Sequence, residues 1–155
     1  AGVAAMVSLG LGSALAPSMV AKRLAVTGAT LLPLVEAEDL PGRVQTHEAE
    51  FRAALDTLAD LPVVGDIRGL GYFYGIELVK DRDTKETFSE EEGERLLRKL
   101  LSPRLFELGL ICRADDRGDP VLQLSPPLVA GPEEFDRIAD VIRTALTESM
   151  EELSS

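Results

Sequence analysis

Two arginines in one region of the chain, Arg113 and Arg117, carry the side chain best suited to binding a small anionic ligand. A guanidinium can bind a carboxylate through two parallel hydrogen bonds, a geometry that lysine does not reproduce. Arg113 follows three apolar residues and is expected to end a short strand, and Arg117 is expected at the tip of the next loop. The pattern alone favours a structural salt bridge for Arg113 over ligand binding. Arg68, which has Asp66 close by, is expected to be a local structural clamp.

Other residues that could carry chemistry have simpler structural explanations. The glycine-rich run Gly69–Gly75 lacks the dinucleotide-binding spacing and precedes a strand, so its glycines are expected to let the backbone turn. The acidic run Asp115–Asp119 lacks the ligand spacing and distal glutamate of an EF-hand, so a hairpin turn is expected there. Cys112 and His47 are expected to be core residues and not a nucleophile pair.

The composition of the chain excludes several classes of binding partner. With 155 residues, the chain fits one domain that can bury a core without disulfides or a metal. Its 16 basic and 27 acidic residues give a net charge of −11, so we expect neither nucleic acid nor an anionic membrane as a partner. One cysteine and one histidine exclude an internal disulfide and a His-rich metal site, so we assign no metal ligands. We expect a cytoplasmic protein.

Residues 1–33 differ from the rest of the chain. Residues 1–35 contain only two charged side chains, both basic. Glycine, serine and proline interrupt this stretch, so it is a poor transmembrane candidate, and it lacks the basic start of a signal peptide. We expect an atypical apolar segment, either decayed or foreign or a divergent lead-in, followed by a domain at residues 34–155.

The apolar pattern predicts the elements that position the arginines. The first is a helix at about 43–60 that ends at Leu61-Pro62, followed by a segment at 63–71 and a strand at 72–79. A second helix runs from the capping box Ser89-Glu92 to Gly109. Strands at 110–113 and 121–124 follow, and a last helix begins at Gly131. The buried stripe is Val44, His47, Phe51, Leu55 and Leu58 in the first helix and Phe135, Ile138, Ile142, Ala145 and Ser149 in the last. This order predicts an α+β fold in which helices cover one face of a small, mostly antiparallel sheet.

Three sequence runs, taken together and in order, resemble a known family. They are Leu61–Val79, Gly109–Arg113, and Gly118-Asp119 followed by Leu124–Leu128. Over about residues 34–150, the chain resembles the C-terminal part of the class III pyridoxal-phosphate-dependent aminotransferases. The resemblance implies the small domain of a fold type I enzyme, with a larger cofactor-holding domain in the parent enzyme.

The resemblance also implies an activity and its partners. Enzymes of this family move an amino group between an amino acid or amine and a keto acid or aldehyde. Small-molecule donors and acceptors, pyridoxal 5′-phosphate and a homodimer are therefore implied for the parent enzyme. Arg113 matches an arginine that binds the substrate carboxylate in many relatives. The following loop is a few residues longer here than in the commonest version, so Arg117 stays open as the alternative.

One group that the reaction needs has no counterpart in this chain. The lysine that holds the cofactor as an imine belongs to the large domain of these enzymes, and none of the four lysines lies in a matching motif; they are Lys22, Lys80, Lys85 and Lys99. We therefore assign no catalytic and no cofactor-binding residue, and we expect the chain alone to be inactive and to bind no cofactor. The alternative is a non-catalytic α+β module for ligand binding, regulation or dimerisation.

We predict that the chain, incubated with pyridoxal phosphate, forms no imine with it and does not transaminate. Transamination needs an amine that holds the aldehyde and moves a proton between carbons. Absorbance spectra before and after borohydride treatment check this prediction. An imine absorbance band that borohydride abolishes would contradict it.

Overall fold

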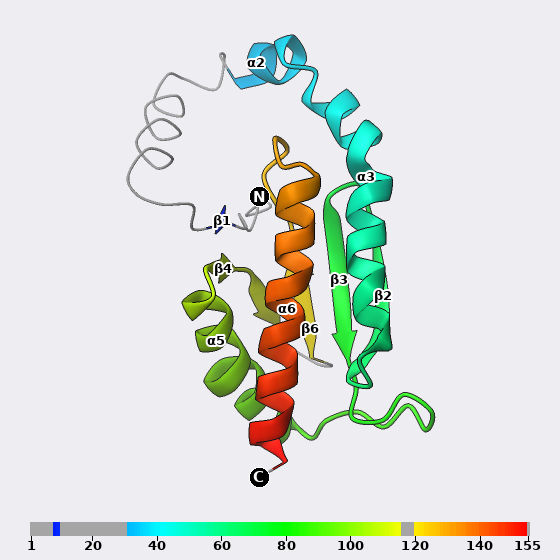
Figure 1. The fold of residues 1–155 in the computed structure, drawn as a ribbon, viewed down its shortest axis with the longest axis vertical. Helices are drawn as coiled ribbons and strands as arrows, with labels where there is room; N and C mark the ends of the chain where they lie inside the picture. Colours follow the sequence, from blue (N-terminus) through cyan, green and yellow to red (C-terminus); the bar gives the residue numbers. More distant parts are fainter. Residues whose placement is uncertain (1–7, 10–30, 116–119, 155) are drawn as a thin grey trace.

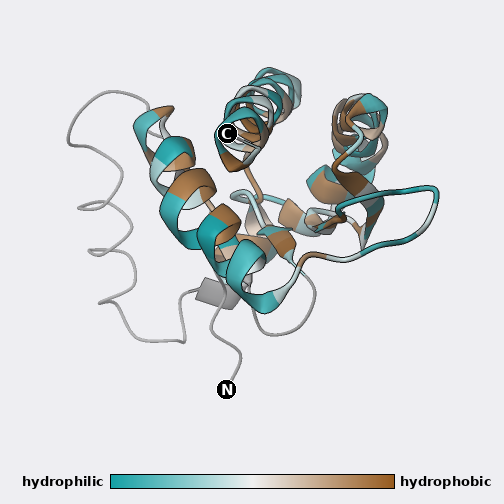
Figure 2. Cartoon of the chain, turned by 90° about the horizontal axis from the view of Figure 1, so that it is seen from below, coloured by the Kyte–Doolittle hydropathy of each residue, from teal (hydrophilic) through white to brown (hydrophobic). Residues whose placement is uncertain are grey.

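The computed structural model describes residues 8–9, 31–115 and 120–154. They form an α+β fold around a four-stranded antiparallel sheet, as the sequence predicts (Figure 1). The sheet has the strand order β2-β3-β6-β5. Its strands are β2 (Val64–Leu70), β3 (Phe73–Leu78), β5 (Arg113–Asp115) and β6 (Val121–Leu124). The long helices all lie on one side of this sheet (Figure 2).

The helices begin and end close to where proline and glycine predict. α3 (Leu40–Asp56) continues as the 3₁₀ turn η1 (Thr57–Asp60), which stops at Leu61, the residue before Pro62. Gly131 caps the last helix, and a proline occupies the first turn of that helix. The remaining helices are α2 (Leu31–Ala37), α4 (Glu90–Glu94), the π-helix η2 (Arg95–Leu101), α5 (Ser102–Glu107) and α6 (Pro132–Leu153).

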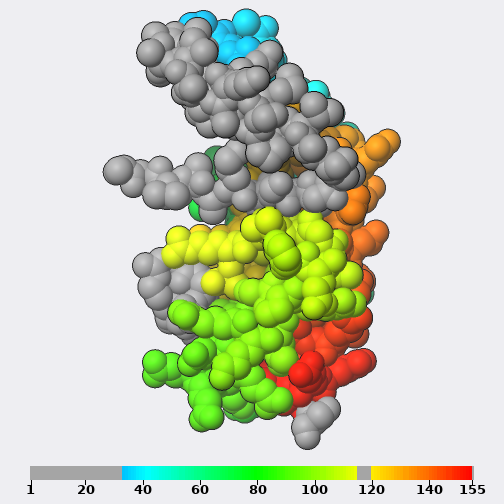
Figure 3. All heavy atoms as spheres, turned by 90° about the vertical axis from the view of Figure 1, so that its left-hand side faces the viewer, coloured from blue at the N-terminus to red at the C-terminus, as the bar shows by residue number. Residues whose placement is uncertain are grey.

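The middle helical segment starts with the predicted capping box. The Ser89 hydroxyl accepts a hydrogen bond from the Glu92 backbone at 3.3 Å, and the Glu92 carboxylate accepts one from the Ser89 backbone at 2.9 Å. Pro103 lies in the first turn of α5, which continues directly from the π-helix η2. Gly109 follows α5 with a φ of 89°, a left-handed conformation that favours glycine. η2 and α5 share one surface with the end of α6 (Figure 3).

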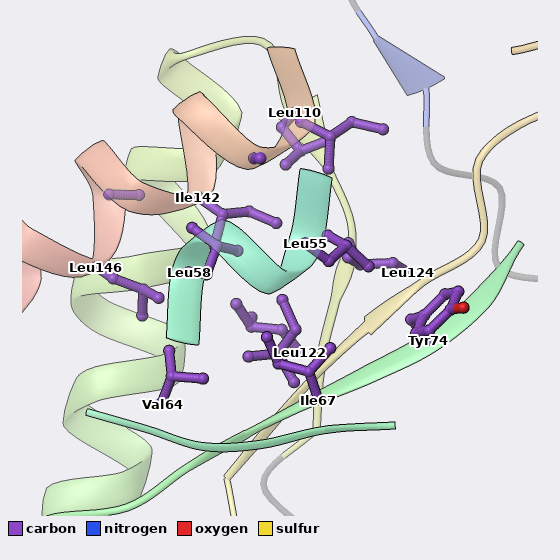
Figure 4. Close-up of a cluster of buried hydrophobic side chains, with 14 of the residues drawn as sticks. Leu55, Leu58, Val64, Ile67, Tyr74, Leu110, Leu122, Leu124, Ile142 and Leu146 are labelled. Atoms are coloured by element: carbon purple, nitrogen blue, oxygen red, sulfur yellow. The ribbon is translucent and has the colours of Figure 1, made fainter. Parts of the chain in front are cut away.

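The core lies between the sheet and the helices α3 and α6. Within it, the ring of Phe51 lies 5.8 Å from that of Tyr72, 5.3 Å from that of Tyr74 and 4.7 Å from that of Phe135. Aliphatic side chains from both layers make up most of the core; they include Leu55, Leu58, Val64, Ile67, Leu122, Leu124, Ile142 and Leu146 (Figure 4). The stripe predicted for the last helix is buried throughout.

The predicted stripe of the first helix is buried only in its second half. Phe51, Leu55 and Leu58 are fully buried, whereas Val44 is only partly so. His47 keeps 25% of its side chain exposed, and its Nδ1 lies 2.6 Å from Oε2 of Glu50. The prediction of a core histidine is therefore wrong. The first turns of α3 extend past the end of the sheet, which leaves them little to pack against (Figure 1).

The strand expected at 110–113 is in fact two short strands with different partners. β4 (Leu110–Ile111) pairs with β1 (Ser8–Leu9), whereas β5 pairs with β6, and Cys112 lies between the two. Arg113 therefore begins a strand, and the expectation that it ends one is wrong. Residue alternation predicts extended backbone, but it does not specify the partner with which that backbone pairs.

Glycines shape the hairpin formed by β2 and β3. Gly71 has a φ of 59° in the turn, a conformation that glycine adopts without strain. At Gly69, an added Cβ would lie 2.2 Å from the carbonyl oxygen of Phe73. The glycine-rich run therefore serves the backbone, as predicted, and Gly69 lets the two strands approach each other closely.

Two arginines cover the outer edge of β2. Arg52 of α3 donates a hydrogen bond to the Ile67 carbonyl at 2.9 Å. Arg82 donates to the carbonyls of Val64 at 2.9 Å and of Leu61 at 2.6 Å. Unpaired groups on an edge strand are otherwise a template for pairing with another chain. These arginines therefore satisfy part of the edge from within the chain.

We predict that Gly69→Ala lowers the free energy of unfolding by about 1–3 kcal/mol, because the new methyl group overpacks a backbone contact. Urea unfolding followed by circular dichroism measures this change. Gly93→Ala is the matched control: its Cβ would meet only the Pro120 side chain, at 3.4 Å, and alanine favours the helix. Equal losses of stability in the two variants would contradict the role of Gly69.

Candidate functional site

Arg113 opens β5, an edge strand of the sheet. The strand register places it in one row across the sheet with Gln123 of β6, Gly75 of β3 and Arg68 of β2. The adjacent row packs against the core and consists of Ala114, Leu122, Ile76 and Ile67. Successive side chains in a strand point to opposite faces. The Arg113 row therefore belongs to the face directed away from the helices, which we call the open face.

The backbone around Arg113 is anchored, whereas its side chain is exposed. The residues on either side of it, Cys112 and Ala114, pack against the hydrophobic core. Gly75 adds no side chain to the same row, and a Cβ there would lie 3.3 Å from the Val121 side chain. Arg113 thus stands on a fixed strand, in a row of the open face where Gly75 contributes no side chain. Two-point binding of a carboxylate requires such a fixed base.

Arg68, in the same row, is a structural clamp, as predicted. Its Nη1 donates a hydrogen bond to Oδ2 of Asp66 at 3.0 Å and another to the carboxylate of Glu77. The hydrogen bond with Glu77, followed by that with Asp66, raises the pKa of the Arg68 guanidinium. This arginine therefore joins β2 to β3 on the open face.

Arg117 lies in residues 116–119, outside the described residues, so its assignment stays a prediction. The strands on either side of that loop are described. β5 and β6 pair antiparallel, and Asp115 lies opposite Val121. The hairpin predicted around the acidic run is therefore confirmed at both of its ends.

Cys112 is a structural residue and not a nucleophile. It is partly buried against the core, and burial raises the pKa of its thiol to about 12. The thiolate is the reactive form of cysteine, so this thiol is almost entirely protonated at neutral pH. His47, the other candidate for a nucleophile pair, is instead hydrogen-bonded to Glu50 on α3.

The lysines of the described residues do not fit a cofactor imine. Lys80 lies 2.9 Å from Glu92 and 3.6 Å from Glu86, and the hydrogen bond with Glu92 raises the pKa of its ammonium group. An imine needs the neutral amine, preferably in a desolvated pocket. Lys85 and Lys99 are exposed. No step of a pyridoxal phosphate reaction can therefore be assigned to these three side chains.

We also searched the part of the chain that the structure describes for a metal site and for a membrane-spanning helix. It contains no group of three His, Cys, Asp or Glu side chains that could hold a metal ion. None of its helices is long and apolar enough to cross a membrane.

Comparison with known proteins shows the family to which the chain belongs. The family model described as class III aminotransferase matches residues 3–146. The chain belongs to this family. A probable aminotransferase of Mycobacterium tuberculosis is 52% identical over 125 residues, which cover 81% of this chain and 27% of that protein. The putrescine–pyruvate aminotransferase of Pseudomonas aeruginosa is 38% identical over 75% of this chain and 24% of its own length.

Solved structures of transaminases share the fold. An (S)-enantioselective omega-transaminase from Thermomicrobium roseum is similar with a TM-score of 0.68 and 28% identity, over 77% of this chain and 25% of that one. An adenosylmethionine-8-amino-7-oxononanoate aminotransferase from Methanocaldococcus jannaschii has a TM-score of 0.65 and 33% identity, over 76% and 25%. This class III chain therefore spans about a quarter of the length of the relatives it matches.

Sequence reasoning missed the surroundings of Arg113 on the open face. Gln123 and Gly75 share its row only because of the strand register. The alternation of Gln123 with Leu122 and Leu124 indicates that Gln123 faces away from the core. It does not indicate that β6 lies between β3 and β5, which is what brings these residues together.

We predict that the Cys112 thiol is alkylated by iodoacetamide at pH 7.5 at least about tenfold more slowly in the native chain than in the urea-unfolded chain. The reason is that a thiol pKa near 12 leaves far less thiolate than the ordinary value does. Mass spectrometry at timed intervals gives both rates. Equal rates would show that the thiol is neither buried nor perturbed.

Proposed function

We propose that residues 34–155 act as the small domain of a class III aminotransferase and that Arg113 binds the carboxylate of its substrate. The observation that carries this proposal is the position of Arg113 on the open face, exposed and on an anchored strand. A guanidinium in that position offers a carboxylate two parallel hydrogen bonds. The substrates would be a small amino donor and a keto acid or aldehyde acceptor.

The substrates named for the relatives support a site that binds carboxylates. Curated relatives include a putrescine–pyruvate, a taurine–pyruvate and a diaminobutyrate–2-oxoglutarate aminotransferase. Pyruvate and 2-oxoglutarate carry a carboxylate, whereas putrescine carries none. An arginine that binds one partner and accommodates the other suits such a pair of substrates.

The lysines indicate which part of the enzyme would hold the cofactor in this proposal. The described lysines are exposed, and Lys80 is tied to carboxylates. The residues that hold pyridoxal phosphate would therefore belong to another part of the enzyme, and the described residues would contribute substrate recognition. A homodimer and a cytoplasmic location are part of the same proposal. The family match begins at residue 3, which favours a divergent lead-in over a foreign segment for residues 1–33.

The role of Arg113 can be tested in a hybrid enzyme. Residues 34–155 replace the matching region of the putrescine–pyruvate aminotransferase of Pseudomonas aeruginosa, which is 38% identical to this chain over 117 residues. We expect Arg113→Ala to raise the apparent KM for pyruvate roughly 10- to 100-fold, because hydrogen bonds to charged groups contribute about 1.5–3 kcal/mol. We expect kcat/KM for putrescine to stay within about twofold, because that amine has no carboxylate for the arginine to bind.

Two further variants sharpen this test. Arg113→Lys keeps the charge but not the two-point geometry, so it should recover only part of the affinity for pyruvate. Arg68→Ala removes another arginine of the same row and should leave the ratio of pyruvate to putrescine kinetics unchanged. Equal losses for both substrates in Arg113→Ala, or an equal effect of Arg68→Ala, would refute the assignment.

A further inference from the structure

β2 lies at the edge of the sheet, where its outer side could accept another strand. Among the described residues, β3 is the only strand that pairs with it. The carbonyls of Val64 and Ile67 point to the outer side, where arginine side chains reach them. In an antiparallel strand, alternate residues direct their backbone groups to the same side, so Gly69 adds its own N–H and C=O there. Such an edge is a template for pairing with a further strand.

Arg82 covers the start of this edge with several hydrogen bonds. Its Nε donates to the Val64 carbonyl at 2.9 Å, and its Nη2 donates to the same oxygen at 2.6 Å. Nη2 also reaches two carbonyls of the preceding turn, at 2.6 and 2.8 Å. Farther along β2, Arg52 of α3 donates to the Ile67 carbonyl at 2.9 Å. A strand that paired with this edge would have to displace both arginines.

The loop that carries Arg82 is closed by its own hydrogen bonds. The Thr84 backbone donates to Oδ1 of Asp81 at 2.8 Å. The Lys80 backbone donates to the Glu86 carbonyl, also at 2.8 Å, and the Lys80 and Glu86 side chains form an ion pair. Because the loop is tied at its base, Arg82 loses less conformational freedom when it binds the edge of β2.

The sequence of β2 is complementary to itself in the antiparallel direction. When Ile67 of one copy lies opposite Ile67 of another, Asp66 of each copy lies opposite Arg68 of the other. Opposite charges in directly facing positions stabilise a strand pair. The side chains of Arg68 and Asp66 are 60% and 56% exposed, and they form an ion pair within the chain that two copies could exchange. A second copy of β2 is therefore a strand whose charges fit this edge.

We propose that Arg52 and Arg82 guard the edge of β2 and prevent its antiparallel pairing with β2 of a second copy of this chain. The contact is autoinhibitory, because the arginines occupy carbonyls that the N–H groups of a second strand would otherwise bind. Arginine has no acceptor, so the outward N–H groups of β2 keep their capacity to pair. Removal of the two side chains opens the whole edge, and two open edges form a two-fold symmetric dimer. The guard acts in the chain itself, whatever its substrate.

The test removes both guards from the 155-residue chain, as Arg52→Ala together with Arg82→Ala. We expect the weight-average mass in sedimentation to rise toward twice that of the wild-type chain, because open edges pair. The matched control is Arg104→Ala together with Arg143→Ala. It removes the same charge, and both of its arginines form ion pairs between helical segments. The control should leave the mass at the wild-type value.

A further substitution tests the proposed register. Asp66→Lys, added to the unguarded variant, should return the mass to the wild-type value, because it places like charges opposite each other across the two strands. In the guarded chain, Asp66→Lys should leave the mass unchanged. Hydrogen exchange gives an independent measure, since the N–H groups of Ile67 and Gly69 should exchange more slowly in the unguarded variant than in the wild-type chain.

Two results would overturn the proposal. One is an unguarded variant that keeps both the mass and the circular dichroism of the wild-type chain. The other is association that Asp66→Lys does not reverse, because a different surface would then be responsible. Should the alanine variant unfold, Arg52→Lys together with Arg82→Lys decides instead: lysine keeps the charge but lacks the spread donors of a guanidinium, so the mass should rise partway.

Discussion

The alternation of side chains in the antiparallel sheet is the constraint on which the other features depend. Ile76 and Leu122 must be buried under the helices, and their neighbours Gly75 and Gln123 are thereby placed on the open face. Arg113 follows the same rule, because Ala114 occupies the core row. A slip of one residue would exchange the two faces and bury the arginine. The register is therefore a condition both for the core and for the candidate site.

The charged side chains divide into those that hold the fold and those suited to recognition. Arg52 and Arg82 satisfy carbonyls at the edge of β2, and Arg68 joins two carboxylates on neighbouring strands. Lys80 is tied to the carboxylate of the capping glutamate, Glu92, whose pKa falls to about 2, chiefly through this hydrogen bond. None of these groups is arranged to form a covalent bond with a cofactor. For Arg113 we propose a different role, the binding of a substrate carboxylate.

The open face of the sheet carries both charged and apolar side chains. Among the described residues, the long helices cover only one side of the sheet, and an antiparallel sheet of this kind can leave its other side to solvent or a partner. Here that side carries Leu70 and Phe73 as well as Arg113. The opposite face carries the core row Ala114, Leu122, Ile76 and Ile67, so the two faces of the sheet differ sharply in composition.

Local features of this protein were determined by the sequence itself. Ser89 and Glu92 predicted a helix start, Pro62 a helix end and Gly109 a cap, because each acts through backbone groups a few residues away. The buried stripe of the last helix and the family resemblance were likewise predicted from the sequence. The exposure of His47, the start of β5 at Arg113 and the gathering of Leu70 with Leu128 were decided only by the tertiary structure. Each depends on which segments, distant in the chain, become neighbours, and a residue's own type and spacing do not contain that information.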